Sequence, residues 1–171
     1  TATQAASGDY NASSTTFTVL VSRGAPTYQS IAQVTKTFGI DASFSLTAVM
    51  SGVSNSDGAY TFSSSDASAV SVSGAVATIN AYTPSAITIT ATQAASGNYA
   101  ASSTTFTVLV NRGIPTYQSI AQVTKTFGID ASFSLTAVMS GVSNSNGAYT
   151  FSSSDASAVS IAGAVATINA Y

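Results

Sequence analysis

The stretch AITITATQAASGNYAASSTTFTVLV, residues 86–110, decides how this chain folds. In its first part, Ala86–Ala94, apolar side chains occupy every second position from Ile87 onward, with threonines between them. Its last part, Thr104–Val110, alternates in the same way, and the Ser96–Asn98 stretch between them has turn-forming residues. Alternation with period two in Ile, Val, Thr and Phe predicts two half-buried β-strands.

The same alternation continues outside this stretch, and no segment has a convincing helical periodicity. Five further segments are predicted as strands: Gln29–Phe38, Ser43–Met50, Ala59–Ser65, Ser68–Val72 and Ala75–Tyr82. In Ser43–Met50 the alternation places Phe44, Leu46, Ala48 and Met50 on one face. About seven short strands in about 89 residues match an immunoglobulin-like antiparallel β-sandwich, in which two sheets face each other.

The chain repeats itself with an offset of 89 residues, so that Thr1–Val21 returns as Thr90–Val110. Of the 82 pairs of residues that this offset aligns, 75 are identical. The differences are Asp9/Asn98, Asn11/Ala100, Ser22/Asn111, Ala25/Ile114, Asp57/Asn146, Val72/Ile161 and Ser73/Ala162. A period of this length suits a small domain repeated in tandem better than a solenoid unit of 20–50 residues.

The repeat predicts one complete domain between two partial ones. Residues 1–22 would be the last strands of a preceding repeat, residues 23–112 a complete repeat with its core at about 27–110, and residues 113–171 the first five strands of a following repeat. Arg23–Pro26 and Arg112–Pro115 are predicted linkers. Two interpretations follow: the chain is a section of a longer array, or the ends of one chain complete the next by strand donation into a filament.

Composition excludes several classes of function. Only 6% of the residues are charged, the net charge is −2, and His, Cys, Trp and Glu are absent. Imidazole or thiolate chemistry, disulfides and the usual zinc or iron–sulfur sites are therefore excluded. Four cationic side chains cannot neutralise many phosphates, so we expect no nucleic-acid partner. No apolar run approaches 18 residues, so we expect no membrane span.

The residues resemble a known family. The matching motifs are Lys36-Thr37-Phe38-Gly39, Phe44-Ser45-Leu46-Thr47-Ala48, Ser64-Ser65-Asp66, Ile89-Thr90-Ala91-Thr92-Gln93-Ala94 and Asn98-Tyr99. They resemble bacterial Ig-like tandem repeats, closest to the MBG-type relatives of the invasin and intimin repeats. The resemblance covers essentially the whole period and implies an extracellular Ig-like sandwich of large surface proteins, adhesins or virion surfaces. It implies no reaction.

Several residue types could carry chemistry. A serine nucleophile in Phe62–Asp66 would need a base, for which Lys36, Lys125 or an Asp are the candidates, and no nucleophile-elbow motif is present. The repeated carboxylates could bind Ca²⁺, but two per repeat are few for six to eight oxygen ligands, and turn capping is the simpler role. These carboxylates are Asp41 and Asp66 with their copies Asp130 and Asp155.

Other features admit a structural and a functional interpretation. Lys36 and Lys125 could form an isopeptide bond with an Asn, but the acidic partner that such bonds need is not a Glu here. The Thr88/Thr90/Thr92 row could form an ice- or carbohydrate-binding face, or simply favour a strand. The rings of four tyrosines could stack on sugars or could pack in the core of the sandwich: Tyr10, Tyr28, Tyr60 and Tyr82. Asn11–Ser13 is an N-glycosylation sequon that the second copy lacks. No catalytic, cofactor-binding or metal-binding residue is assigned.

The sequence therefore predicts a structural, non-enzymatic protein of tandem Ig-like domains. It would form a stalk, fibre, filament or surface layer outside a bacterial cell or on a virion, with neighbouring repeats as its partners. The alternative is an adhesin module that binds a glycan or host-surface protein through loops such as Gly52–Tyr60 or Ala81–Ser85. An accessory domain of a secreted enzyme is a third hypothesis.

Overall fold

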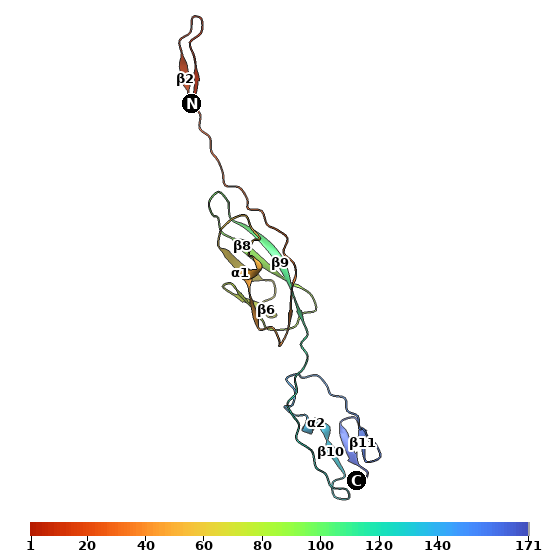
Figure 1. Ribbon diagram of the computed structural model, residues 1–171. Coiled ribbons are helices and arrows are strands. Elements are labelled where there is room, and N and C mark those ends of the chain that lie inside the picture. The colour runs from red at the N-terminus through yellow and green to blue at the C-terminus, as the bar shows by residue number, and fades with distance from the viewer. Residues whose placement is uncertain (171) are drawn as a thin grey trace. The chain divides into compact units, whose positions relative to one another are not determined.

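The computed structural model describes residues 1–170 and divides the chain into two compact units, Thr1–Gly113 and Ile114–Tyr171 (Figure 1). Its regular elements are short strands and two single-turn helices of four residues each. The predicted all-β class is therefore confirmed. Among the described residues no helix has the length and apolar character needed to cross a membrane.

The complete copy forms a β-sandwich of seven strands, β3 to β9, as the alternation predicted. One sheet has four strands in the order β3 (Val34–Thr37), β9 (Ser102–Asn111), β8 (Ile87–Gln93), β5 (Tyr60–Ser64). The other sheet has three strands in the order β4 (Ser43–Ser45), β7 (Val76–Ile79), β6 (Val70–Ser73).

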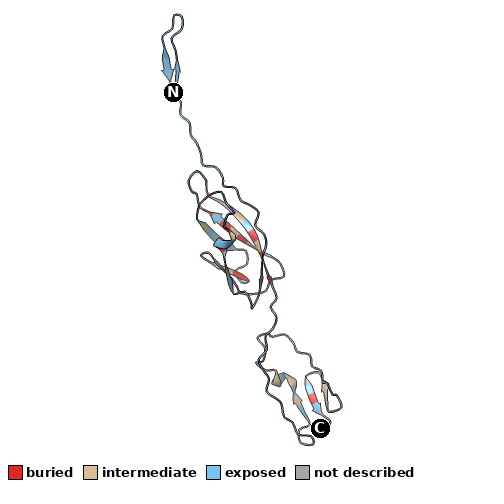
Figure 2. Cartoon of the chain, in the orientation of Figure 1, coloured by how far each residue is buried: buried red, intermediate tan, exposed pale blue. Residues whose placement is uncertain are grey.

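Strands β8 and β9 supply most of the core. They pair antiparallel over seven positions, with Ile89 opposite Phe106 and Ile87 opposite Val108. The alternate residues that were expected to face inward on both strands are buried, whereas the residues between them are half-buried or exposed (Figure 2). The smaller sheet adds Val70, Ala77 and Ile79 to the same core.

One strand pair departs from the antiparallel prediction. β3 runs parallel to β9, with Val34 opposite Val108 and Lys36 opposite Val110. A parallel pair needs a long connection, and here the rest of the sandwich forms that connection. Alternation of side chains is the same in both orientations, so the sequence pattern did not distinguish them.

The predicted strand Ser43–Met50 is wrong in its second half. β4 ends at Ser45, and Leu46–Val49 forms the helical turn α1. The Ser45 hydroxyl accepts a hydrogen bond from the backbone N–H of Ala48 at 3.2 Å, which caps the first turn of the helix. The helix buries Leu46 and Met50, four residues apart, and leaves Ala48 exposed. Ser45, the third residue of the alternating run, therefore caps the helical turn at the point where the strand ends.

The N-terminal copy of the β8–β9 stretch forms only a small hairpin. β1 (Ala2–Gln4) pairs antiparallel with β2 (Ser13–Thr15), and all their residues are exposed. No described strand follows β2 before β3, so the stretch from Phe17 to Val21 stays outside any sheet. Large apolar side chains in that stretch are exposed.

The C-terminal unit forms a smaller set of elements than its sequence predicts. It contains β10 (Ser132–Ser134), the helical turn α2 (Leu135–Val138), β11 (Val159–Ala162) and β12 (Val165–Ile168). These strands form one sheet in the order β10, β12, β11. Five strands were expected here and three form. The missing two are the counterparts of β3 and β5, whose pairing partners in the complete copy are β9 and β8.

Candidate functional site

Asp66 caps a turn. Its Oδ1 accepts hydrogen bonds from the Ser68 hydroxyl at 2.6 Å and from the backbone N–H groups of Ser68 at 3.0 Å and Ala69 at 3.3 Å. The Ser68 hydroxyl bond is the main cause that lowers the pKa of this carboxyl below its ordinary value. Asp155 makes the same bonds with Ser157 and Ala158, and its pKa is lowered for the same main reason.

Asp41 also closes a local turn. It accepts a hydrogen bond from the backbone N–H of Thr37 at 2.7 Å and forms an ion pair with Lys36 at 3.4 Å. The Thr37 N–H is the largest cause that lowers the pKa of Asp41, followed among the lowering causes by Lys36. The Lys36 ammonium also lies 5.4 Å from the centre of the Phe44 ring. Asp130 repeats the arrangement with Thr126 and Lys125, and its pKa is lowered in the same way.

These contacts favour the structural interpretation of the charged residues. Backbone or hydroxyl donors already occupy the repeated carboxylates, and in the part of the chain that the structure describes no three potential metal ligands gather. The Lys36 ammonium lies 3.4 Å from the Asp41 carboxylate, so the contact found for it is an ion pair.

The serines of Phe62–Asp66 also have structural partners. The Ser64 hydroxyl accepts a hydrogen bond from the backbone N–H of Asp66 at 3.2 Å, and the Ser65 hydroxyl accepts one from Thr88 at 3.0 Å. These bonds fix the end of β5 against β8. They place both hydroxyls in turn contacts rather than beside a general base.

The threonine row on β8 belongs to a wider hydroxyl-bearing face. Thr88, Thr90 and Thr92 pair with Thr107, Thr105 and Ser103 of β9. On the other side of β8, Thr90 and Thr92 pair with Ser63 and Thr61 of β5. This outer face of the larger sheet carries hydroxyl groups without charge. It can donate and accept hydrogen bonds with water or with a polar surface.

The tyrosines take several positions. Tyr28 and Tyr60 pack against the core, and Tyr60 stacks on Phe62 with ring centres 5.9 Å apart. Tyr82 lies under the guanidinium of Arg112 at 4.5 Å. Tyr10 is exposed in the N-terminal hairpin, as is Asn11 of the glycosylation sequon. Two of the four tyrosines thus support the core interpretation.

The structure reveals one polar cluster that the sequence analysis did not single out. The buried Gln93 side chain donates to the carbonyls of Ser56 at 2.7 Å and Gly58 at 3.0 Å, and accepts from the Ser54 hydroxyl at 2.7 Å. It thereby fixes the loop before β5. A polar residue in the inward register of Ile87, Ile89 and Ala91 was the signal for this cluster.

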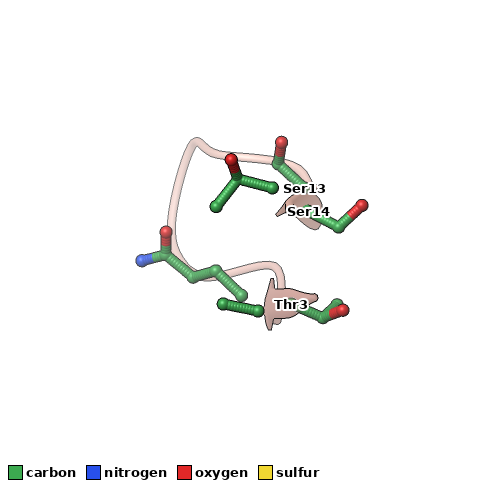
Figure 3. A pocket seen from close by; sticks show the side chains of 6 residues that line it. Thr3, Ser13 and Ser14 are labelled. Carbon is green, nitrogen blue, oxygen red and sulfur yellow. The ribbon is translucent and has the colours of Figure 1, made fainter. Parts of the chain in front are cut away.

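The surface hollows of the first unit include one beside the N-terminal hairpin and one beside the Asp66 turn. A hollow of about 340 Å³ beside the N-terminal hairpin is lined by the small polar strands themselves, and Figure 3 shows Thr3 and Ser14, which pair across the hairpin, projecting from the same side. A second hollow, of about 360 Å³, lies between the Asp66 turn and the Ala81–Ser85 loop. The lining of the first hollow contains no titratable side chain, and that of the second contains Tyr82 and Asp66, whose carboxylate already caps a turn.

Comparison with known proteins gives no relative. No protein-family model, curated protein or solved structure matches the chain. The functional argument therefore depends on the residues and contacts described above.

Proposed function

We propose that this chain is a structural, non-enzymatic protein built from tandem Ig-like domains, which act as spacers in an extracellular stalk, fibre or surface layer of a cell or virion. The near-identity of the two copies supports this proposal, because 75 of 82 aligned residues are the same. A spacer requires interchangeable units. Two enzymatic or binding sites would not require such identity.

The positions at which the chain enters and leaves the complete domain carry this proposal. Gly24 pairs with the backbone of Asn98 and Ala100, just before β9, while the chain leaves beyond Asn111 at the other end of the same strand. Ten residues of strand span about 33 Å. Entry and exit at opposite ends suit domains that transmit tension along their strands.

The low content of basic residues and the absence of cysteine would suit a protein that persists outside a cell. Only four Lys or Arg residues are available to trypsin-like proteases. The fold requires no disulfide, so its stability is independent of the redox state outside a cell.

The test is a series of polypeptides with increasing numbers of the Arg23–Asn111 period, measured by electron microscopy. Contour length that rises by a constant step for each added period supports the spacer function. Particles that stay compact as periods are added contradict it.

An adhesin module is the second candidate, and the hollow beside Ala81–Ser85 is the observation that favours it. A glycan array and a host-cell binding assay with the 171-residue chain test this alternative. Saturable binding that S68A or Y82A abolishes would support the adhesin and contradict a pure spacer.

A further inference from the structure

We propose that the backbone pairing between the segments Gly24–Thr37 and Asn98–Asn111 is the load-bearing element of the complete domain. We call this pairing the parallel clamp, and tension along the chain loads it in shear. The inference deepens the proposed spacer function and rests on it, because a spacer under tension needs an element that resists extension. All the contacts that carry it lie within the first unit, Thr1–Gly113.

The parallel clamp is paired at both of its ends. At the entry end, the Gly24 N–H donates to the Asn98 carbonyl at 2.9 Å, and the Gly24 carbonyl accepts from the Ala100 N–H at 2.7 Å. These bonds form a parallel bridge between Gly24 and Tyr99. At the exit end, β3 pairs in parallel with the last four residues of β9. The two points of pairing therefore have the same direction.

The exit end is held beyond the last strand pair. The Phe38 N–H donates to the Asn111 carbonyl at 3.0 Å. The next residue, Arg112, places its guanidinium 4.5 Å from the centre of the Tyr82 ring. Gly113 lies so close to the Phe38 carbonyl oxygen that a Cβ atom would overlap it. The chain is thus fixed to the domain up to the residues at which it leaves.

The loop between the two points of pairing is also held. The Thr27 N–H donates to Oδ1 of Asn55 at 2.9 Å, and the Gln29 N–H donates to the Val53 carbonyl at 2.8 Å. Pro26 is buried. Tension that enters at Gly24 therefore meets bound backbone along this loop before it reaches β3.

The direction of the load follows from the parallel orientation. Tension on the chain pulls the Gly24 end of the first segment backward and the Asn111 end of β9 forward. The two segments run in the same direction, so these pulls oppose each other along the strands. The bonds of a parallel pair are evenly spaced along the strands, so they share the load and must break together. Pulling both segments from one end would break them one after another.

The boundary between β3 and β9 is where extension must begin. β9 pairs with β8 over seven positions and with β3 over four, so β9 stays with the sheet while β3 is pulled away. Val108 and Val110 beside this boundary are fully buried, and Val34 packs against the same core. Water therefore has little access to the inner side of the pair, and backbone hydrogen bonds are stronger in such surroundings.

Single-molecule force spectroscopy of the 171-residue chain tests the parallel clamp. The chain has no cysteine, so paired cysteine substitutions define where the pulling handles attach. S22C/I114C applies force at opposite ends of the clamp, and S22C/A101C applies it at one end; all three positions are exposed. We expect unfolding of the first pair to need at least about twofold more force, because its bonds break together.

Phe38 offers a matched pair of variants at the exit end. Gly39 has a φ of +79°, and the Ile40 N–H donates to the Thr37 carbonyl at 3.2 Å, as in a type II turn. Proline is favoured at the second position of that turn, so F38P fits its backbone and removes the N–H that donates to Asn111. F38A keeps this donor. With the S22C/I114C handles, F38P should unfold at a lower force than F38A.

Gly24 offers a second matched pair at the entry end. Its φ is not positive, and a Cβ atom there would meet no atom within 4 Å, so G24A keeps both backbone bonds. G24P removes the N–H that donates to Asn98. With the S22C/I114C handles, G24P should also unfold at a lower force than its alanine control.

Equal unfolding forces in the two pulling directions would overturn the proposal. So would F38P and G24P variants that both unfold at the forces of their alanine controls. The comparison of directions uses neither proline variant, so it decides the proposal even where one of them fails to fold. None of these outcomes alters the constant step in contour length expected for each added period. Failure of the clamp and failure of the spacer function are therefore distinguishable.

Discussion

The complete copy, residues 27–110, and the partial copy, residues 116–170, have nearly the same sequence and different structures. Val34–Thr37 is a strand whereas residues 123–126 are not, although the two sequences are identical. The β6–β7 hairpin, in contrast, recurs as β11–β12 with the same register. The comparison shows that an element forms wherever its pairing partner is supplied, and that sequence alone does not create a strand.

The helical turns, in contrast to β3, form in both copies. α1 and α2 have the same bounds relative to the repeat and the same capping serine. The cap bond is made within three residues, and the one distant bond, from the N–H of Leu46 to Ala75 or of Leu135 to Ala164, is present in both copies. The side chains of the two turns differ, however. Leu46 is buried, whereas Leu135 is half-buried because the sheet that would cover it is incomplete. The backbone conformation of this turn is therefore the same in both copies, although the burial of its leucine differs.

Among equivalent positions of the two copies, Phe106 and Phe17 should differ most in what their substitution costs in free energy of unfolding. F106A should lower the free energy of unfolding of the first unit by about 3–5 kcal/mol, because it removes a buried aromatic side chain and leaves a cavity. F17A changes the exposed counterpart and should have an effect within about 0.5 kcal/mol. Urea unfolding followed by tyrosine fluorescence measures both effects, at concentrations at which the chain is monomeric. Equal effects would show that Phe17 is packed too.

Gln93 is the second point of difference. Q93A leaves the carbonyls of Ser56 and Gly58 without their donor, and at about 1–3 kcal/mol for each unsatisfied group the expected loss of stability is about 2–6 kcal/mol. Q4A changes the exposed counterpart and should leave the unfolding curve unchanged. Backbone amide exchange of residues 54–58 provides a local measurement. Unchanged protection in Q93A would contradict the role of Gln93 in fixing this loop.

Substitution of Gly58 tests how closely the backbone just before β5 approaches the backbone just after β8. A Cβ atom at Gly58 would overlap the carbonyl oxygen of Ala94, whereas one at Gly147 would meet only the Ser145 hydroxyl at 3.6 Å. G58A should therefore cost about 1–3 kcal/mol through overpacking. G147A, in the copy that lacks a β8, should be neutral in the single chain. Thermal unfolding of the two variants measures the difference, and a neutral G58A would refute the close contact.

Much of the complete copy was predictable from its sequence. The seven strands coincide with the alternating segments, because a side chain on every second residue must face the core when a strand is half-buried. The turn-capping role of Asp66 was also predictable, since Asp bonds to the backbone within the next residues. Both features depend on short-range geometry.

Other features were not predictable because they depend on distant partners. The parallel direction of β3 is set by a contact with β9 across more than 70 residues, and alternation contains no information on direction. The helical turn at Leu46 replaces a strand because Ser45 competes for the backbone N–H of Ala48. Gln93 was recognisable only as a polar residue in an apolar register, and its three partners lie in a loop 35 to 39 residues earlier.

The smallest expected effect is the acid titration of the turn aspartates, and it is the one in which both copies should behave alike. The pKa values of Asp66 and Asp155 lie below the ordinary Asp value of 3.8, chiefly because a serine hydroxyl two residues on donates to each carboxylate. A folded-state pKa below the unfolded value adds stability that is fully present above the unfolded pKa. That stability is lost as the pH falls through the folded pKa.

Carboxyl-carbon NMR titration of the full chain measures these two pKa values directly. We expect both residues to titrate below 3.8, and S68A and S157A each to raise the pKa of its own aspartate by removing the main donor. The bonds lie within three residues, so the missing β8 and β9 partners of the C-terminal unit should not matter. A lowered pKa at Asp66 together with an ordinary pKa at Asp155 would contradict this expectation. It would show that the turn needs the complete sandwich and is not determined by nearby residues alone.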